Sequence, residues 1–495
     1  MRQEPRIPQK IYSNEDARKI DLAAMKKEGI NSYLLMHKAA EAALEHTIKQ
    51  FSYTKHWKVI CGGGNNAGDG FVFARLAAKK GFDVSVSALV LPENLKNDAL
   101  QAYKDFIADN GKFGLWSGSI DPNADLIVDA ILGSGLSRKI KGSFSEAVDK
   151  INKHDAKVVS LDIPTGINSD TGALMGNAVR ADMTIIFVAL TGSCYMGHGQ
   201  NYYGEKKFDD LDIPRDCYNE VKPQIECISN EVITNALPVR ERDAHKGDFG
   251  HLLIVGGSPG MLGAVLLAGE AALRCGAGRV TIATHPSHCD SIPLTRPELM
   301  SCPIRKANDI DEILSDITTI VIGPGFGISD WANEIFSKVI TSSQPIVVDA
   351  DGLNLLAKKP NQREDWILTP HPGEAARLLN DSTTNVQLDR LSSLKRLQKM
   401  YKGNIVLKGM GTLIASKDSI PLICTEGNPG MASPGMGDIL AGIIGGLLAQ
   451  GLSSSESAAI GVAIHAKSGD IAALIGERGT IATDLMDQIK FWANP

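Results

Sequence analysis

The chain has 495 residues, of which 43% are hydrophobic and 22% charged, and its formal net charge is −6. This composition is typical of globular proteins and excludes wholesale disorder, and the length exceeds what one hydrophobic core usually supports, so we expect two domains. A duplex-binding protein normally carries a basic face and no basic run stands out here, so we expect no nucleic-acid partner; acidic small molecules such as nucleotides stay possible.

Apolar segments and cysteines indicate whether the chain is suited to a membrane or to an oxidising compartment. The N-terminal segment MRQEPRIPQK has no apolar stretch of the kind a signal peptide needs. The most apolar stretch, residues 439–448, is too short to span a bilayer. The eight cysteines are scattered without a C-x-x-C pair, which argues against a disulfide framework or a zinc site. We therefore expect a cytoplasmic protein with no membrane partner.

The first half of the chain carries apolar runs with helical patterns between them. One such pattern covers Tyr33 to Ile48, and Asn31 and Ser32 are suited to cap it. The apolar runs are continuous rather than alternating, which is typical of parallel strands buried on both faces. We expect strands at residues 57–61, 84–91, 126–132, 158–163 and 185–190.

A second series of the same kind follows a polar segment, residues 208–242, that is broken by Pro214, Pro223 and Pro238. We expect the domain boundary there, so that residues 1–222 form one domain and residues 223–495 the other. Helices are expected from Ile439 to Gln450 and from Glu456 to Leu474. Strands are expected at residues 252–255, 280–283, 320–322, 346–348, 366–368 and 405–407.

A glycine-rich loop, Gly62–Gly70, follows the first strand directly and precedes an expected helix at residues 71–79. Glycines permit a tight turn, and a helix N-terminus offers free N–H groups to an anion. Read loosely, Gly62-x-Gly64-x-x-Ala67 is a dinucleotide-binding fingerprint. A dehydrogenase needs an acidic residue at the end of the second strand, but that strand ends in Leu-Pro before Glu93. The loop alone is also compatible with a plain glycine turn.

Two further polar loops follow later strands of the same half. Gly133–Arg138 comes after the third strand and Asp162–Asn168 after the fourth. Ligands of open α/β sheets bind beyond the carboxyl ends of the strands, so the three loops can form one site. A single Asp after a strand is more often a helix cap, but Asn66, Asp129 and Asp162 together supply hard oxygen ligands suited to a cation.

The second half has a phosphate-binding pattern without a P-loop. Lys408–Thr412 follows a strand, and Asn428–Asp438 precedes the helix expected from Ile439. Gly435 and Gly437 would leave backbone N–H groups bare at the helix start, where they can bind a phosphoryl group in transfer. Asp438 could accept a proton from an attacking hydroxyl. A capped helix explains the Gly-x-Gly-Asp string alone nearly as well, but the accompanying strings favour catalysis.

The motifs of the first half resemble the NAD(P)H-hydrate epimerase domain over residues 10–215, through GGGNNAGDGFVFAR, VDAILGSGL-x-R and LDIPTGI-x-S-x-TG. By this resemblance Asp162 contacts the substrate and acts as the acid–base group, and Asn66, Asp129 and Thr165 hold a potassium ion. Thr165 and Asn168 stand where the family usually has Ser and Asp. The residues implied to surround the hydrated cofactor are Asn65, Asn66, Ala67, Gly68, Asp69, Gly133, Ser134, Gly135, Leu136, Ser137, Arg138 and Lys139.

The motifs of the second half resemble the ADP-dependent NAD(P)H-hydrate dehydratase, of ribokinase-like fold, over residues 230–495. The strings are His245-Lys246-Gly247, GHLLIVGGS, IGPGFG, DADGLN, LTPHPGE, VLKGMGTLI and MASPGMGDILAG. The implied contacts to the hydrate come from Ala264, Gly325, Gly327, His371, Pro372, Gly373, Glu374 and Asp438. The implied ADP contacts come from Lys408, Gly409, Met410, Gly411, Thr412, Asn428, Gly430, Gly435, Met436 and Gly437.

The two resemblances imply an α/β protein with an N-terminal Rossmann-like αβα sandwich and a C-terminal ribokinase-like αβα domain. The implied activity is repair of hydrated NADH and NADPH: epimerisation of the R and S hydrates and ADP-dependent dehydration of the S form, with magnesium accompanying the nucleotide. We also expect a homo-oligomer. The rivals are a vitamin-precursor-type kinase, a scaffold like the epimerase-like domains of a decapping scaffold or an apolipoprotein-binding protein, and last a plain dehydrogenase.

Overall fold

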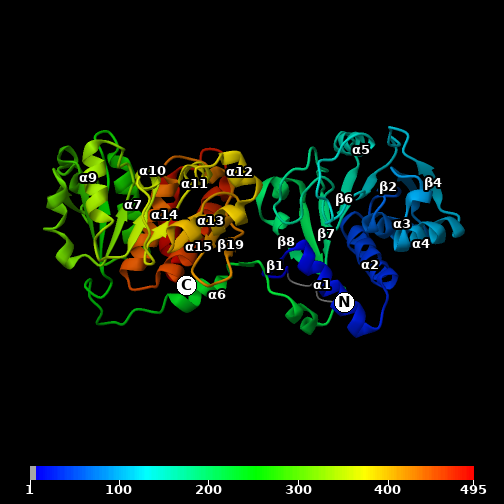
Figure 1. Cartoon of the computed structure of the whole chain (residues 1–495), viewed down its shortest axis with the longest axis horizontal. Helices are drawn as coiled ribbons and strands as arrows, with labels where there is room; N and C mark the ends of the chain where they lie inside the picture. The colour runs from blue at the N-terminus through cyan, green and yellow to red at the C-terminus, as the bar shows by residue number, and fades with distance from the viewer. Residues whose placement is uncertain (1–6) are drawn as a thin grey trace. The chain divides into compact units, whose positions relative to one another are not determined.

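The computed structural model describes residues 7–495 and divides into two compact units between Ile225 and Glu226 (Figure 1). The sequence predicts this division near residue 222. Each unit is an α/β layer structure with its own hydrophobic core. The predicted fold class is confirmed.

Unit 1 is built on a seven-stranded sheet in which every neighbouring pair is parallel. The five predicted strands are present, and two edge strands that the sequence analysis missed, β4 and β9, complete the sheet. Strand β9 is largely polar, and the four-residue β4 has Phe113 and Leu115 separated by a glycine, so neither shows the apolar run used to find the others. In spatial order the strands are β4 (Lys112–Leu115), β3 (Asp83–Ala88), β2 (His56–Cys61), β5 (Leu126–Ala130), β6 (Lys157–Leu161), β7 (Met183–Phe187) and β9 (Glu205–Asp209).

Helices cover both faces of this sheet because its strands are apolar on both sides. Val59 and Cys61 of β2 pack with α2 (Ser32–Gln50), α3 (Asn65–Lys79) and α4 (Asn97–Ala108). Ile60 points the other way, toward α5 (Ser143–Asn152). As predicted, Asn31 caps α2, accepting a hydrogen bond from the N–H of Leu34. A further helix, α1 (Asn14–Glu28), follows the short strand β1 (Lys10–Tyr12), which pairs with β8 (Leu190–Thr191).

Unit 2 is built on a larger sheet that is parallel in its central part and ends in an antiparallel ribbon. The seven consecutive strands β13, β12, β11, β14, β15, β16 and β17 are parallel to one another, whereas β18 is antiparallel to both β17 and β19. All six predicted strands are present. The spatial order is β13 (Met300–Pro303), β12 (Arg279–Thr284), β11 (His251–Val255), β14 (Thr319–Ile322), β15 (Ile346–Val348), β16 (Ile367–Leu368), β17 (Asn404–Leu407), β18 (Thr412–Ala415), β19 (Leu422–Cys424) and β10 (Ile225–Cys227).

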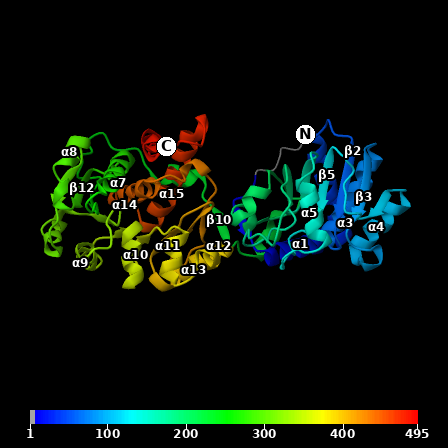
Figure 2. The same ribbon diagram turned by 90° about the horizontal axis from the view of Figure 1, so that it is seen from above.

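The helices of unit 2 also form two layers (Figure 2). One layer packs with β11, β12 and β14 in the main core; it contains α6 (Asn230–Ala236), α7 (Leu262–Cys275), α14 (Met436–Ala449), α15 (Ser454–Ala472) and α16 (Met486–Trp492). The remaining helices of the unit are α8 (Ser291–Thr295), α9 (Asp330–Val339), α10 (Ala350–Lys358), α11 (Pro372–Leu379), α12 (Thr383–Leu388) and α13 (Arg390–Tyr401). Ser454–Ile475 is apolar and long enough to cross a membrane, but more than half of it is buried inside the unit, as in core helices of globular domains.

Helices α7 and α14 pack with their backbones in contact. A Cβ on Gly442 would lie 2.1 Å from the carbonyl oxygen of Ala268, and one on Gly446 would lie 3.0 Å from that of Ala272. Gly442 and Gly446 are one helical turn apart, so they form one bare stripe on α14. This close approach fixes the position of α14, whose first residues contribute to the site described below.

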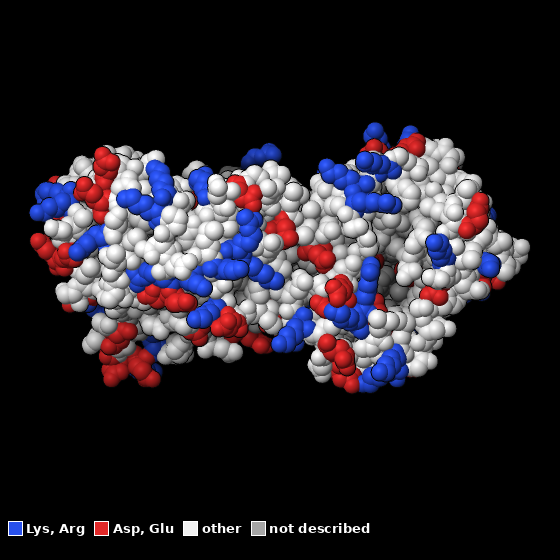
Figure 3. Space-filling model, viewed as in Figure 1, with Lys and Arg blue, Asp and Glu red and all other residues white. Residues whose placement is uncertain are grey.

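Charged side chains of both signs are intermingled on the face of the molecule shown in Figure 3. Ion pairs among the described residues include Arg396 with Asp381 at 2.8 Å and Lys338 with Asp311 at 2.8 Å. A surface of this kind does not produce the uniform positive field that steers a phosphate backbone.

Candidate active sites

In unit 1 the predicted site residues follow β2, β5 and β6, next to the point where the strand order reverses, whereas most of those in unit 2 follow β14, β16 and β17 or begin α14. In unit 1 the chain moves from β2 outward through β3 to β4, then returns to the other side of β2 with β5. In unit 2 the corresponding reversal lies between β11 and β14. The crevice outside the carboxyl ends of the strands at such a point is the usual ligand site of an open α/β sheet.

The glycine-rich segment of unit 1 corrects one prediction. Residues 65–70 were predicted as loop, but α3 begins at Asn65, so they form its first turns. The helix starts early because the first residues pack inward: Ala67 and Gly68 are buried against the core. Only Asn65, Asn66 and Asp69 of the predicted segment carry polar side chains. Asn66 is 7% exposed, yet neither its Oδ1 nor its Nδ2 has a hydrogen-bond partner among the described residues. Buried polar atoms normally have partners, so this side chain is suited to bind a ligand.

Asp129 and Thr165 are joined in a buried hydrogen-bond network. The Thr165 hydroxyl donates to Asp129 Oδ1 at 2.7 Å, and the Thr165 N–H donates to Asp129 Oδ2 at 2.9 Å. Ser160 and the N–H of Ile131 supply two further donors. Burial raises the pKa of Asp129, and these hydrogen bonds oppose that effect. The carboxylate is therefore well satisfied by the protein itself, and its neighbours fix it in one position.

Asp162 faces the loop that follows β5. Its backbone has φ of +66°, a conformation that is uncommon for a residue with a side chain and recurs at functional sites. Its Oδ2 accepts the N–H of Ser134 at 2.9 Å. A Cβ on Gly133 would lie 2.7 Å from that oxygen and 3.4 Å from Asn66 Cγ, so Gly133 leaves space that Asp162 and Asn66 share. Burial raises the pKa of Asp162 and that of Asp69, which lies near it.

The rest of the second predicted segment is more open. Leu136 is 8% exposed and belongs to the core under the loop, whereas Gly135, Ser137, Arg138 and Lys139 are exposed. The segment therefore presents backbone and two cations to solvent at the rim of the site. Such groups suit the phosphates of a dinucleotide.

In unit 2, Asp438 lies in the first turn of α14, as predicted. Gly435 precedes the helix with φ of +90°, and Met436 is buried in the core. A Cβ on Gly435 would lie 2.5 Å from Cδ1 of Leu267, so this glycine packs against α7. A Cβ on Gly437 would lie 3.3 Å from Lys408 Nζ. Burial and the nearby Asp349 carboxylate raise the pKa of Asp438 to about 7, and Lys408 lowers it. A carboxyl group with such a pKa is suited to general-base work at neutral pH.

Lys408 links the carboxylates of this site. Its ammonium donates to Asp349 Oδ1 at 2.7 Å and lies 3.9 Å from Glu374. Thr369 also donates to Asp349, at 2.7 Å. The side chain of Lys408, predicted as an ADP contact, thus points toward the Asp438 side of the site, which leaves the backbone of its segment to meet a nucleotide. Burial raises the pKa of Glu374 to about 7, and Lys408 lowers it.

His371 is half-exposed and caps α11, with Nδ1 accepting the N–H groups of Gly373 and Glu374. Glu374 completes the capping box by accepting the N–H of His371 at 2.8 Å. Burial and the nearby Lys408 lower the pKa of His371. The ring therefore lies half-exposed at the start of a helix.

The glycines predicted to meet the hydrate lie on a neighbouring loop. A Cβ on Gly325 would lie 2.6 Å from the carbonyl oxygen of Met261 and 3.1 Å from the Cβ of Ala264, so these predicted residues are in contact. The N–H of Gly327 donates to Asp351 at 2.8 Å. Gly325, Gly327 and Ala264 thereby line the same crevice as Asp351, which follows β15.

The loops predicted to bind ADP are held by partners that the sequence analysis missed. Arg390 is 2% exposed and donates to the carbonyl oxygens of Leu407, Lys408 and Gly411, which fixes the turn before Thr412. Asn428 Oδ1 accepts the N–H of Gly430 at 3.0 Å, and its amide donates to Asp470 at 2.9 Å. The predicted Met410 is 45% exposed. No local pattern around Arg390 or Asp470 indicates these contacts, because both are far away in sequence.

Two acidic residues of unit 2, Asp349 and Asp351, lie in the DADGLN string, which the sequence analysis used only as a family motif. A carboxylate directly after a strand end was the available signal. In unit 1 the missed residues are Arg18 and Asp21 on α1, for which a helical pattern alone gives no signal.

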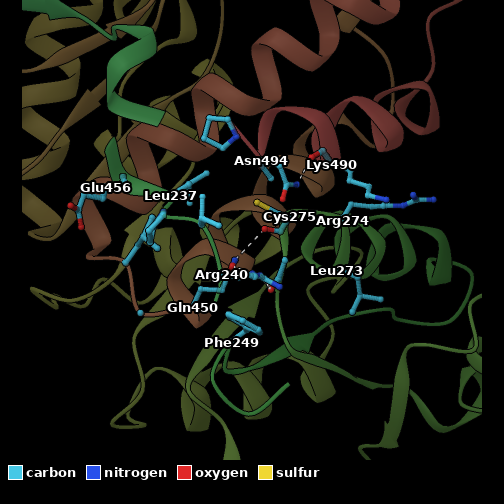
Figure 4. Close-up of a pocket in the computed structure, with 18 of the residues that line it drawn as sticks. Leu237, Arg240, Phe249, Leu273, Arg274, Cys275, Gln450, Glu456, Lys490 and Asn494 are labelled. Carbon is cyan, nitrogen blue, oxygen red and sulfur yellow. Dashed lines mark hydrogen bonds between the residues drawn. The ribbon is translucent and has the colours of Figure 1, made fainter. Parts of the chain in front are cut away.

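A cavity of about 1100 Å³ in unit 2 lies apart from these clusters (Figure 4). Arg240 crosses it, donating to the carbonyl oxygen of Gly276 and to Gln450 and lying 3.6 Å from the centre of the Phe249 ring. Among the described residues, its lining includes none of the predicted site residues. Cavity size alone therefore does not locate the chemistry here.

Comparison with known protein families agrees with this geometry. A family model described as NAD(P)H-hydrate dehydratase matches residues 252–490, and one described as YjeF-related protein N-terminus matches residues 32–192. The dehydratase of Bacillus subtilis, co-crystallised with ATP and Mg²⁺ and named ADP/ATP-dependent NAD(P)H-hydrate dehydratase, superimposes with a TM-score of 0.51 at 29% identity, covering 54% of this chain and 97% of that one.

Full-length relatives carry both halves. The bifunctional NAD(P)H-hydrate repair enzyme Nnr of Coxiella burnetii is 44% identical over 486 residues, which is 98% of this chain and 99% of the relative. The enzyme of the same name from Escherichia coli is 39% identical over 490 residues, 99% of this chain and 95% of the relative. The chain belongs to the family of bifunctional NAD(P)H-hydrate repair enzymes.

Proposed function

We propose that unit 1 interconverts the R and S hydrates of NADH and NADPH, and that unit 2 dehydrates the S hydrate with ADP, releasing AMP and phosphate. Family membership supports the pair of activities. The observation that carries the assignment of unit 2 is the position of Asp438 beside Gly435 and Gly437 at the start of α14, close to Lys408 and Asp349.

The chemistry of unit 2 follows from this arrangement. Asp438 takes the proton of the C6 hydroxyl of the hydrate. The hydroxyl oxygen forms a bond to the β-phosphorus of ADP, and AMP leaves. The N–H groups of Gly435 and Gly437 stabilise the charge on the phosphoryl oxygens. Loss of phosphate from C6 and of a proton from C5 then restores the double bond. Lys408 balances Asp349 and Glu374, so that Asp438 is not forced to stay protonated.

Magnesium bound to the nucleotide would supply charge neutralisation for this transfer. The carboxylates of Asp349 and Asp351 both raise the pKa of Asp438, and both residues follow β15 in the chain. Magnesium in nucleotide sites usually keeps several waters and needs only one or two carboxylates. The residues present therefore fit the ion. The preference for ADP as the nucleotide is part of the proposal.

In unit 1 we assign the substrate contacts to the first turn of α3 and the Gly133–Lys139 segment, and acid–base work to Asp162. We assign the potassium site to Asn66, Asp129 and Thr165. The unpartnered Oδ1 of Asn66 supports this assignment, since an amide oxygen is a suitable hard ligand. Asp129 and Thr165 are joined by two hydrogen bonds, and the N–H of Leu132, the residue before Gly133, donates to the Thr165 hydroxyl.

One experiment tests the proposal as a whole. The protein is incubated with a mixture of both hydrate epimers and either ADP or ATP, and recovery of NADH absorbance is followed. Complete recovery with ADP, faster than spontaneous epimerisation allows, is the expected result. A stable phosphorylated product, with no recovery of absorbance, would instead identify a small-molecule kinase.

Eight free cysteines support a reducing, cytoplasmic location for the reaction.

A further inference from the structure

Helix α1 is fixed firmly to unit 1 although the family model for the epimerase half begins only at residue 32. Ser13 caps the helix, and the N–H of Asn14 donates to Asp170 at 2.7 Å. Ile20 and Ala24 are buried in a separate small core cluster with residues near the end of the unit. The orientation of the remaining faces of α1 is therefore set by packing.

Arg18 and Asp21 are three residues apart, so they lie on one face of α1. The Nη2 atom of Arg18 lies 3.3 Å from the position of a Cβ on Gly135, which brings the guanidinium onto the loop after β5. This is the loop whose Ser134 N–H binds Asp162. The face of α1 that carries Arg18 and Asp21 thus borders the proposed epimerase site.

The electrostatic effects agree with that placement. Burial and then the Asp162 carboxylate raise the pKa of Asp21 to about 7, and Arg18 lowers it. Burial also raises the pKa of Asp162, which Arg18 lowers too. Asp21 and Asp162 both act on Asp69. The carboxyl groups of Asp21, Asp69 and Asp162 are thus electrostatically linked, and burial disfavours the ionised form of each.

Two side chains at this site are buried and have polar atoms without partners among residues 7–495. Asn66 has two such atoms and is more than nine-tenths buried, and Asp21 has a buried Oδ1. Gly133 leaves space between Asn66 and Asp162, as described above. Buried polar groups in folded proteins normally find partners, so these atoms indicate a polar ligand.

We propose that Asp21 is the second acid–base group of the epimerase site and acts with Asp162 on the C6 hydroxyl of the hydrated nicotinamide. This inference rests on the role proposed above for Asp162. One carboxyl group donates its proton to the C6 oxygen, the C6–O bond breaks, and the lone pair of the ring nitrogen forms a C=N bond as water leaves. Water then adds to C6 from the opposite face, its proton goes to the other carboxylate, and the ring nitrogen regains its lone pair.

The test compares full-length variants, starting from the R hydrate alone and following the appearance of the S hydrate. Asp21→Asn keeps the shape but cannot transfer a proton. We expect its epimerase kcat to fall roughly 10²–10⁴-fold with little change in KM, and its ADP-dependent dehydration of the S hydrate to stay normal. Asp21→Glu should recover part of the loss. Glu15→Gln is the matched control on the same helix, because Glu15 is 82% exposed and pairs only with Lys19 among the described contacts.

A melting curve distinguishes catalysis from a structural role. Asp21 is buried beside other carboxyl groups, so the neutral amide should leave the Tm unchanged or raise it. A lower Tm with proportional loss of activity, or an epimerase kcat within about twofold of the parent, would overturn the proposal. Asp162→Asn is run in parallel: if it too is fully active, the proposed function of Asp162 fails, whereas an inactive Asp162→Asn beside an active Asp21→Asn refutes only the role of Asp21.

Discussion

Replacing Asp438 by Asn is the sharpest test of unit 2. The amide preserves the shape of the side chain, but it cannot take a proton at neutral pH. A general base typically contributes roughly 10²–10⁴-fold, so the rate of dehydration should fall by about that factor. ADP binding should change little, because backbone groups and the Lys408–Thr412 segment meet the nucleotide.

The structure also predicts the effect on stability. Burial, and then Asp349, raise the pKa of Asp438 from its ordinary value of 3.8 to about 7. A raised carboxyl pKa means that ionisation destabilises the folded state; the penalty grows between about pH 4 and pH 7 and is constant above. The difference corresponds to at most about 4 kcal/mol, and partial exposure reduces it. The variant should therefore melt at the same or a higher temperature at pH 8, and the gain should vanish near pH 4.

The assay pairs the turnover rate with the Tm at pH 8. In the parent, turnover should rise about tenfold per pH unit below pH 7 and level off above, because the base must be ionised. Asp330→Asn is the matched control, since Asp330 is an exposed acidic residue in the first turn of α9. Near-normal turnover of Asp438→Asn, or a Tm lowered at pH 8, would refute the reasoning and leave Asp438 with a structural role only.

Three further predictions address other parts of the molecule. Residues 223–495 alone should consume only the S hydrate; clearance of both epimers above the spontaneous rate would contradict the division of labour. Asp129→Ala should weaken epimerisation and leave dehydration intact, and potassium should raise both the epimerase rate and the Tm of the parent; indifference to potassium would remove the ion. Lys408→Met leaves Asp349 and Glu374 buried without a cation, at about 3–5 kcal/mol, so its Tm should fall more at pH 8 than at pH 5, where the carboxyl groups can protonate; equal losses would argue against this charge balance.

The sequence predicts the layers of both units well because buried parallel strands leave continuous apolar runs. Edge strands such as β4 and β9 are not predicted, because many of their residues are exposed or half-exposed and no continuous apolar run marks them. The start of α3 was placed too late because glycines usually signal a loop, whereas Gly68 and Gly70 here allow close packing within a helix.

Site residues were predictable where they follow a strand or precede a helix. Asp162 directly follows β6 and Asp438 lies in the first turn of α14, so both positions carry that signal. Asp21 and Arg390 do not, because each reaches its site from an element whose own pattern describes only an ordinary amphipathic helix. Their roles depend on tertiary packing, which local sequence does not encode.

The backbone contact between α7 and α14 has a consequence for protein engineering. Replacing a helical glycine by alanine is commonly used to stabilise proteins, because alanine is favoured in a helix by roughly 0.5–1 kcal/mol. At Gly442 the added methyl would collide with the Ala268 carbonyl, 2.1 Å away, and only a shift of one helix could relieve the clash. Because Asp438 lies one turn before Gly442, that shift would move the Asp438 carboxylate away from the C6 hydroxyl of the substrate. Variants chosen for helix propensity alone would therefore lose turnover through Gly442, a residue that does not contact the substrate.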